Sequence, residues 1–152
     1  MPVVSQCRQA VRSFGRSAFL FLALFLAGCE KKGTPRLPDV KPGEVMVLTE
    51  AALDAATAKG VVLVDFCAAW CPPCKTQGPI VAEVAAEMSG TKGVLVASLD
   101  ADTIGPETIE RFNMEFIPTL IIFKNGKPFK TFTGLTEKET LIEAINDTRT
   151  AK

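Results

Sequence analysis

Cys71 and Cys74 are separated by two prolines and stand where an apolar stretch gives way to a helix-like pattern. A cysteine at the amino terminus of a helix lies near unpaired backbone N–H groups and the positive end of the helix dipole, which favour the thiolate. The thiolate is the nucleophile of thiol–disulfide exchange. We therefore expect an exposed Cys71 to attack a disulfide, and a shielded Cys74, one turn into the helix, to resolve the mixed disulfide.

Other uses of these cysteines fit the residue types less well. A structural disulfide across two residues closes too small a loop to stabilise much, and a zinc site has no histidine to draw on. Haem attachment requires a histidine where Lys75 stands. Soft thiolates suit Cu(I), but nothing beyond the pair supports a copper site. Including Cys67, the spacing also matches the cluster-binding signature of radical S-adenosylmethionine enzymes, whose partial barrels are much larger than this chain. We therefore predict no metal and no cofactor.

Strand and helix patterns alternate after residue 44, which predicts an α/β fold. Asn125 and Gly126 signal an antiparallel hairpin, while Thr49 and the pair Thr136 and Glu139 have the pattern of helix caps. The expected strands lie at 45–48, 61–67, 94–99, 119–123 and 127–132, and the expected helices at 50–59, 71–89, 106–112 and after 136. Together they predict a central mixed sheet of about five strands flanked by four helices.

The amino-terminal segment has the pattern of an export signal. Three arginines precede the apolar run 18–27, which is too short for a transmembrane helix. The sequence that ends at Cys29 resembles the lipobox of bacterial lipoproteins, in which the cysteine is lipidated. An uncleaved helical anchor, or an ordinary signal with a chance cysteine, is the alternative. We predict a lipoprotein signal peptide at 1–28 and a membrane anchor on Cys29.

Proline and glycine dominate the segment after Cys29, so we predict a flexible tether at 29–44 and one domain at 45–150. The domain would lie in a bacterial cell envelope and face the periplasm or the exterior. Glu30 is not the aspartate associated with inner-membrane retention, which favours the outer membrane. Removing the basic export signal leaves more acidic than basic groups, so the surface offers no footprint for nucleic acid.

From residue 45 to 149 the chain resembles the thioredoxin family. The matching motifs stand in family order and include Pro79 and Gly134 as well as four longer stretches: Val64-Asp65-Phe66, Trp70-Cys71-Pro72-Pro73-Cys74-Lys75, Ile117-Pro118-Thr119 and Phe123-Lys124-Asn125-Gly126. The resemblance implies a thioredoxin fold and a thiol–disulfide oxidoreductase that acts on protein disulfides through a redox-active Cys71–Cys74 disulfide.

The resemblance also implies roles for single residues. Cys71 would be the attacking cysteine and Cys74 the resolving one, with Trp70 as an aromatic shelf beside them. Pro118 would follow a cis peptide bond, and the backbone of Ile117 would pair with an extended substrate segment. Pro72 and Pro73, between the cysteines, would belong to the same substrate-binding surface.

Asp65 interrupts the apolar strand 61–67, and the family buries this carboxylate behind the resolving cysteine. A carboxyl group in an apolar site has a raised pKa and can exchange a proton near neutrality. We therefore predict that Asp65 assists deprotonation of Cys74. The alternative is a strand aspartate whose carboxylate is satisfied by a nearby backbone or hydroxyl group.

Three residues depart from the family pattern. Cys67 replaces an aromatic residue and is either a small buried apolar side chain or a spare thiol. Ser98 stands where thioredoxins commonly carry a lysine near the buried aspartate. Pro72 replaces a glycine and removes an N–H that would otherwise approach the Cys71 thiolate. Weaker thiolate stabilisation favours the disulfide form and hence a reducing character.

Outside the cytoplasm no nicotinamide pool recharges such a domain, so we expect a membrane thiol relay to donate its electrons. The sequence favours a monomeric, lipid-anchored reductase of exported-protein disulfides. The insertions typical of cytochrome-maturation thioredoxins and of disulfide-introducing oxidants are missing between Cys74 and Pro118. The alternatives are such an oxidant, or a thioredoxin-like module that binds a partner or copper without turnover. The intact cysteine pair, Asp65 and Pro118 argue against the second.

Overall fold

A computed structural model of the chain describes residues 41–151. The predicted signal peptide, Cys29 and most of the predicted tether lie outside the described residues, so those predictions stay predictions. Within 41–151 no helix is long and apolar enough to cross a membrane.

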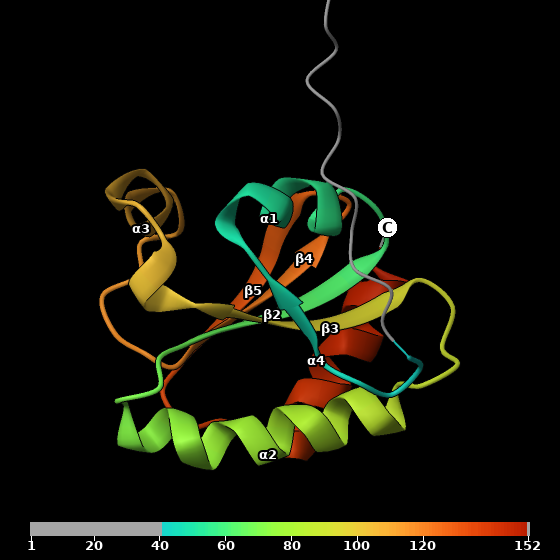
Figure 1. Ribbon diagram of the computed structural model, residues 1–152. Coiled ribbons are helices and arrows are strands. Elements are labelled where there is room, and N and C mark those ends of the chain that lie inside the picture. Colours follow the sequence, from blue (N-terminus) through green and yellow to red (C-terminus); the bar gives the residue numbers. More distant parts are fainter. Residues whose placement is uncertain (1–40, 152) are drawn as a thin grey trace, which may run out of the picture. The chain divides into compact units, whose positions relative to one another are not determined.

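Within residues 41–151, five strands and four helices follow one another in the predicted order (Figure 1). A single 3-10 turn, Ala101–Thr103, follows the third strand. The elements are β1 (Met46–Leu48), α1 (Glu50–Thr57), β2 (Val61–Cys67), α2 (Pro72–Glu87), β3 (Val94–Asp100), α3 (Pro106–Phe112), β4 (Thr119–Lys124), β5 (Lys127–Thr133) and α4 (Lys138–Thr150). These bounds agree with the expected elements to within about two residues at most ends.

The strands form one mixed sheet in the order β1-β3-β2-β4-β5. β3 pairs in parallel with β1 and β2, whereas β4 pairs antiparallel with both β2 and β5. β2 is therefore a central strand, and all its residues except Cys67 are buried. Its carboxyl end leads directly into the segment that carries Cys71 and Cys74.

Helices cover both faces of the sheet, as an apolar central strand requires (Figure 1). Val62, Val64 and Phe66 pack on the side of α1 and α3, whereas Val61 and Leu63 pack on the side of α2 and α4. Because side chains alternate along a strand, the carboxylate at position 65 faces the α2 and α4 side. The helix that carries Cys74 covers this same face.

The hairpin between β4 and β5 has the predicted turn. Asn125 and Gly126 both have positive φ, at 49° and 83°, as a two-residue turn of the mirror-image type requires. The Asn125 side chain accepts a hydrogen bond from the Gly60 amide at 3.0 Å, which ties the hairpin to the start of β2.

Neither of the two predicted helix caps forms its side-chain hydrogen bond. Thr49 is the N-cap residue of α1, as predicted, but its side chain makes no capping hydrogen bond. The pair Thr136 and Glu139 does not form a capping box, because α4 begins after Glu137 and its first position lacks a side-chain cap. The Thr136 hydroxyl instead donates to the carbonyl of Gly134 at 3.2 Å.

Candidate active site

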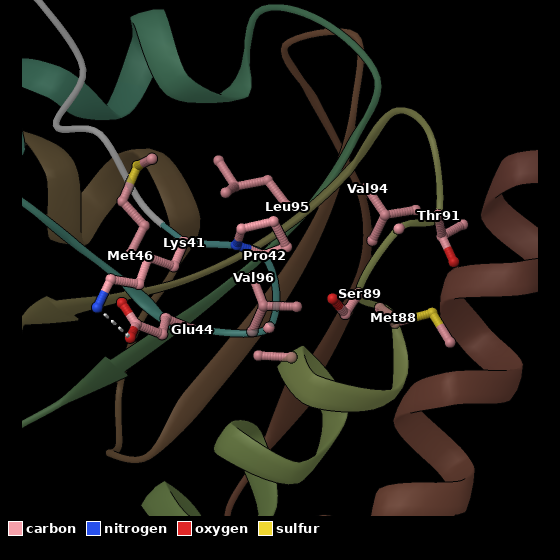
Figure 2. Close-up of a pocket in the computed structure, with 13 residues that line it drawn as sticks. Lys41, Pro42, Glu44, Met46, Met88, Ser89, Thr91, Val94, Leu95 and Val96 are labelled. Carbon is pink, nitrogen blue, oxygen red and sulfur yellow. Dashed lines mark ion pairs between the residues drawn. The ribbon is translucent and has the colours of Figure 1, made fainter.

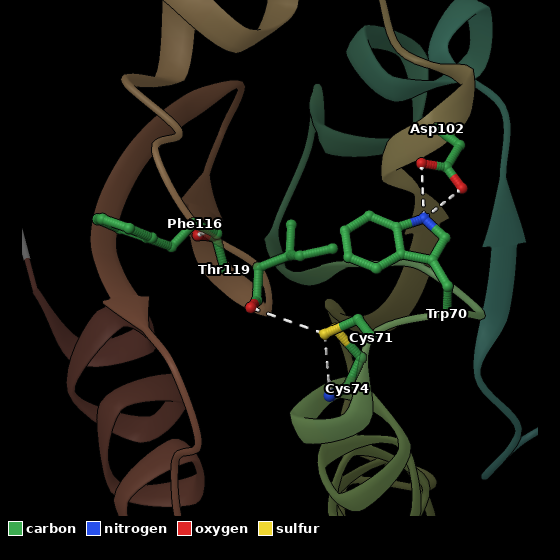
Figure 3. Close-up of a disulfide and its surroundings, with 7 residues drawn as sticks. Trp70, Cys71, Cys74, Asp102, Phe116 and Thr119 are labelled. Atoms are coloured by element: carbon green, nitrogen blue, oxygen red, sulfur yellow. Dashed lines mark hydrogen bonds between the residues drawn. A yellow bond between two sulfur atoms is a disulfide. The ribbon is translucent and has the colours of Figure 1, made fainter.

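The cysteine pair lies between the carboxyl end of β2 and the first turn of α2. Cys71 is the residue that caps α2, and it forms a disulfide with Cys74 across a Cα–Cα distance of 5.3 Å (Figure 3). Pro72 occupies the first helical position, where its missing N–H is not needed. The helix therefore begins directly after Cys71, which places the Cys71 sulfur at the helix amino terminus.

One backbone amide of the helix points at the sulfur of Cys71. The N–H of Cys74 donates to Cys71 Sγ at 3.3 Å. Pro72 and Pro73 have no N–H, so the amide of Cys74 is the first on the helix that can do so. In the reduced protein this contact and the helix dipole favour the Cys71 thiolate, the form that attacks a disulfide.

Cys71 is not exposed, which corrects the prediction from the sequence. Only 2% of Cys71 and 5% of Cys74 are accessible to solvent. Ile117 contributes to this burial, because it packs against the cysteine cluster and its carbonyl oxygen lies 3.7 Å from Cys71 Sγ. A substrate must therefore approach the sulfur alongside the backbone of Ile117.

The peptide bond between Ile117 and Pro118 is cis, as the family resemblance implies. Hydrogen bonds hold the chain on both sides of it. The Pro118 carbonyl accepts from the Gly134 amide at 2.8 Å, and the Thr119 hydroxyl donates to the Phe116 carbonyl at 2.6 Å. This turn is therefore fixed against the end of β5, facing the cysteines.

Trp70 lies beside the disulfide and is 65% exposed. Its indole Nε1–H donates to both carboxylate oxygens of Asp102, at 3.1 and 2.9 Å, so the ring is held in one place (Figure 3). Apolar side chains that include Ile104, Ile109 and Met114 surround an adjoining hollow of about 210 Å³. The exposed ring and the hollow give an extended peptide an apolar surface next to the reactive sulfur.

Asp65 is buried on the sheet face that α2 covers. It is 2% exposed, and its Oδ1 has no hydrogen-bond partner among the described residues. Burial raises the pKa of Asp65 to about 6, and hydrogen bonding by the Cys67 thiol offsets part of that rise. The satisfied strand aspartate considered as an alternative does not fit the unpartnered oxygen. A carboxyl group that titrates near pH 6 can exchange a proton at neutral pH, whereas its role toward Cys74 stays a prediction.

Cys67 is a free thiol that packs against the cluster formed by Ala68, Cys71 and Cys74. Burial raises its pKa to about 11, with further contributions from the charges of Asp65 and Asp100. Such a thiol carries little thiolate at neutral pH and is a poor nucleophile. The arrangement thus gives the exchange chemistry to Cys71 and Cys74.

Gln77 is a site residue that the sequence analysis missed. It is fully buried one turn after Cys74, and its amide group bonds the backbone of Thr136 twice. Nε2 donates to the Thr136 carbonyl at 3.1 Å, and Oε1 accepts from the Thr136 amide at 2.8 Å. These bonds connect the cysteine-bearing helix to the segment that holds the Pro118 turn. A glutamine at an inward-facing helical position was the available signal.

The family model for thioredoxin matches residues 44–147. The chain belongs to the thioredoxin family. Its thioredoxin domain is 37% identical over 102 residues to curated thioredoxins of Staphylococcus aureus, for example those of strains Mu50 and N315. These alignments cover 67% of this chain and 95% of each relative.

The fold agrees with a solved thioredoxin structure. A single-substitution mutant of the thioredoxin from Halobacterium salinarum NRC-1 superposes with a TM-score of 0.63 and 26% sequence identity, over 76% of this chain and 99% of that one. The five-stranded mixed sheet with four helices is therefore the thioredoxin fold. With the Cys71–Cys74 pair, family membership makes the chain a thiol–disulfide oxidoreductase that acts on protein disulfides.

Proposed function

We propose that this thioredoxin is held at a bacterial membrane by a lipid on Cys29 and reduces disulfides of exported proteins. The Cys71 thiolate attacks one substrate sulfur, forms a mixed disulfide and releases the other sulfur as a thiolate. Cys74 then attacks Cys71, which releases the second substrate thiol and leaves the Cys71–Cys74 disulfide. Two electrons pass to the substrate, and a membrane thiol relay returns two electrons to the pair.

The observation that carries the reductive direction is the pair of prolines between the cysteines. Because neither Pro72 nor Pro73 has an N–H, only the Cys74 amide at 3.3 Å is available to the sulfur from this first turn. A thiolate with few donors is less stabilised, so the dithiol form gives up its electrons more readily. A strong oxidant requires the opposite, a strongly stabilised thiolate.

Asp65 supports turnover by its position on the α2 face and its pKa of about 6. Ionised near neutral pH, the carboxylate accepts the proton of Cys74 directly or through water, and the resulting thiolate resolves the mixed disulfide. A module that only binds a partner or copper has no need of a buried carboxylate with one unpartnered oxygen at this place.

A redox titration of the Cys71–Cys74 pair tests the direction. We expect a potential in the range of reducing thioredoxins, about −270 mV, rather than that of strong oxidants near about −120 mV. A potential close to the second value would overturn the reductive proposal. The matched variant is Pro72→Gly, which restores an N–H near Cys71 and should raise the potential toward that of an oxidant.

Two experiments test the location and the substrates. Labelled fatty acid should be incorporated into the full chain but not into a Cys29→Ser variant. In the producing cell, a Cys74→Ser variant should retain exported proteins as mixed disulfides on Cys71. Absence of label on the unaltered chain would refute the lipid anchor, and recovery of only cytoplasmic proteins would refute the substrate class.

A further inference from the structure

Basic side chains gather at the end of the domain opposite to the cysteines. Lys92, Lys124 and Arg149 line a hollow of about 450 Å³ together with Gly60 and Asn125. Lys127 lies opposite Lys124 in the register of the β4–β5 hairpin, and Lys59 precedes Gly60 in the sequence. We call this set the basic pole: Lys59, Lys92, Lys124, Lys127 and Arg149.

The charges of the basic pole are largely uncompensated. Lys59, Lys92, Lys127 and Arg149 are exposed, and none forms an ion pair within residues 41–151. Lys124 donates only to backbone carbonyls at the end of α4, those of Thr148 and Ala151. No acidic residue occurs in the four segments that form the pole, 58–61, 90–93, 124–127 and 148–151, although Asp147 is exposed nearby on α4.

The chain enters the domain beside this pole. Residues 41–43 line a hollow of about 260 Å³ together with Met88, Ser89 and Thr91, which follow the carboxyl end of α2 (Figure 2). The next residue in that loop is Lys92 of the basic pole. The coloured ribbon of Figure 1 accordingly begins beside the end of α2.

The disulfide lies at the other end of the same helix. Cys71 caps the start of α2, whose 16 residues correspond to a length of about 24 Å at 1.5 Å per residue. The point where the tether joins the domain and the point where exchange takes place are thus separated by the whole helix. Lys75, exposed on its first turn, marks the end that carries the disulfide.

We propose that the basic pole rests against anionic phospholipid headgroups of the membrane that carries the chain, so that the Cys71–Cys74 end points away from it. This inference rests on the proposed lipid on Cys29. Twelve positions separate Cys29 from Lys41, so the connecting segment spans at most about 40 Å. This tether allows the basic pole to come within a Debye length, about 10 Å, of the membrane surface, where lysine and arginine side chains are attracted to anionic headgroups. Protein substrates then reach Cys71 without obstruction by the bilayer.

Lysine acylation on vesicles tests this orientation. The lipidated protein is reconstituted into vesicles of phosphatidylcholine with or without phosphatidylglycerol, treated with an amine-reactive reagent, and analysed by peptide mass spectrometry. We expect Lys92 and Lys127 to react several-fold more slowly on anionic than on neutral vesicles, and high salt to abolish the difference. Lys75 is the internal control and should react equally on both.

The outcomes distinguish failure of the proposed orientation from failure of the proposed lipid anchor on Cys29. Protection of Lys75, or equal reactivity of all lysines on both vesicles, would overturn the orientation while leaving the anchor intact. Protein that fails to float with the vesicles would overturn the anchor and the orientation together. Slower acylation on addition of inorganic phosphate alone, without vesicles, would assign the pole to soluble anions instead.

A double variant completes the test. Lys92→Gln with Lys127→Gln should remove the protection of Lys59 on anionic vesicles, while Lys75→Gln should leave it unchanged. Because both positions are remote from the disulfide, the double variant should reduce insulin disulfides as fast as the unaltered protein. Retained protection of Lys59 in the double variant would contradict the proposal.

Discussion

The carbonyl oxygen of Ile117 lies 3.7 Å from the Sγ of Cys71, so the peptide before Pro118 covers the sulfur that attacks. A substrate strand that pairs with the Ile117 backbone therefore places its own disulfide next to Cys71. The reactivity of Cys71 and the alignment of the substrate therefore both depend on the backbone of Ile117. How firmly the Pro118 turn is held against α2 thus becomes a determinant of activity.

Gln77→Ala should loosen that turn and destabilise the domain. The substitution leaves the amide and carbonyl of the half-buried Thr136 without these partners, which costs about 1–2 kcal/mol in the free energy of unfolding. Denaturant titration of the oxidised protein measures this loss, and protein-disulfide reduction should slow in parallel. Thr136→Ala is the control, because it removes only the hydroxyl bond to Gly134. Equal stability of the two variants would show that the Gln77 bonds contribute nothing.

Asp65→Asn should stabilise the oxidised protein at pH 8 by about 1–3 kcal/mol. The folded-state pKa of Asp65 is raised from 3.8 to about 6, so the folded protein holds this proton more tightly than the unfolded chain does. Stability therefore falls as the pH rises from about 4 through 6, and it levels off above. Unfolding titrations at pH 4 and pH 8 check the sign, since the gain from the substitution should shrink toward pH 4. A gain that is independent of pH would contradict the buried ionised carboxylate.

Cys67→Ala should move the pH dependence of the resolving step upward. The Cys67 thiol lowers the pKa of Asp65 by hydrogen bonding, so its removal leaves the carboxylate less stabilised. Decay of a mixed disulfide on Cys71, followed by rapid quenching between pH 5 and 8, should show an inflection near pH 6 in the unaltered protein. The inflection should lie higher in Cys67→Ala and be lost in Asp65→Asn. Identical profiles for all three proteins would remove Asp65 from the proton transfer.

Asp102→Ala should release the indole of Trp70 without unfolding the domain. Both residues are exposed, so the change in the free energy of unfolding should stay within about 1 kcal/mol. Trp70 is the single tryptophan of the chain, and its fluorescence reports the change directly. We expect KM to rise several-fold for a protein disulfide and to stay constant for a small disulfide. Asp102→Asn keeps an acceptor for the indole N–H, so its KM for the protein disulfide should lie between those of the unaltered protein and Asp102→Ala. An unchanged KM in both variants would refute the role of Trp70 in protein binding.

The sheet, the helix order and the cysteine pair could be predicted because their signals are local. Strand alternation, the Asn125-Gly126 turn and a cysteine before a proline-initiated helix are each contained in a few neighbouring residues. The resemblance to thioredoxin added the cis peptide before Pro118, whose partners lie far along the chain.

The features that could not be predicted are contacts between distant segments. The cover on Cys71 comes from a residue 46 positions away, the partner of Trp70 lies 32 positions away, and the bonds of Gln77 span 59. The capping box predicted for Thr136 and Glu139 is absent because Thr136 also contacts a distant segment. Gln77 binds the Thr136 backbone and Gly134 accepts from its hydroxyl, so the local capping pattern is overridden by tertiary contacts.

Trapping of the mixed disulfide tests the central claim most directly. A reduced Cys74→Ser variant is mixed with an oxidised protein substrate, and the adduct is located by peptide mass spectrometry. We expect a stable adduct on Cys71 alone, because burial raises the pKa of the Cys67 thiol to about 11 and the resolving thiol is gone. An adduct on Cys67, or no adduct at all, would contradict it.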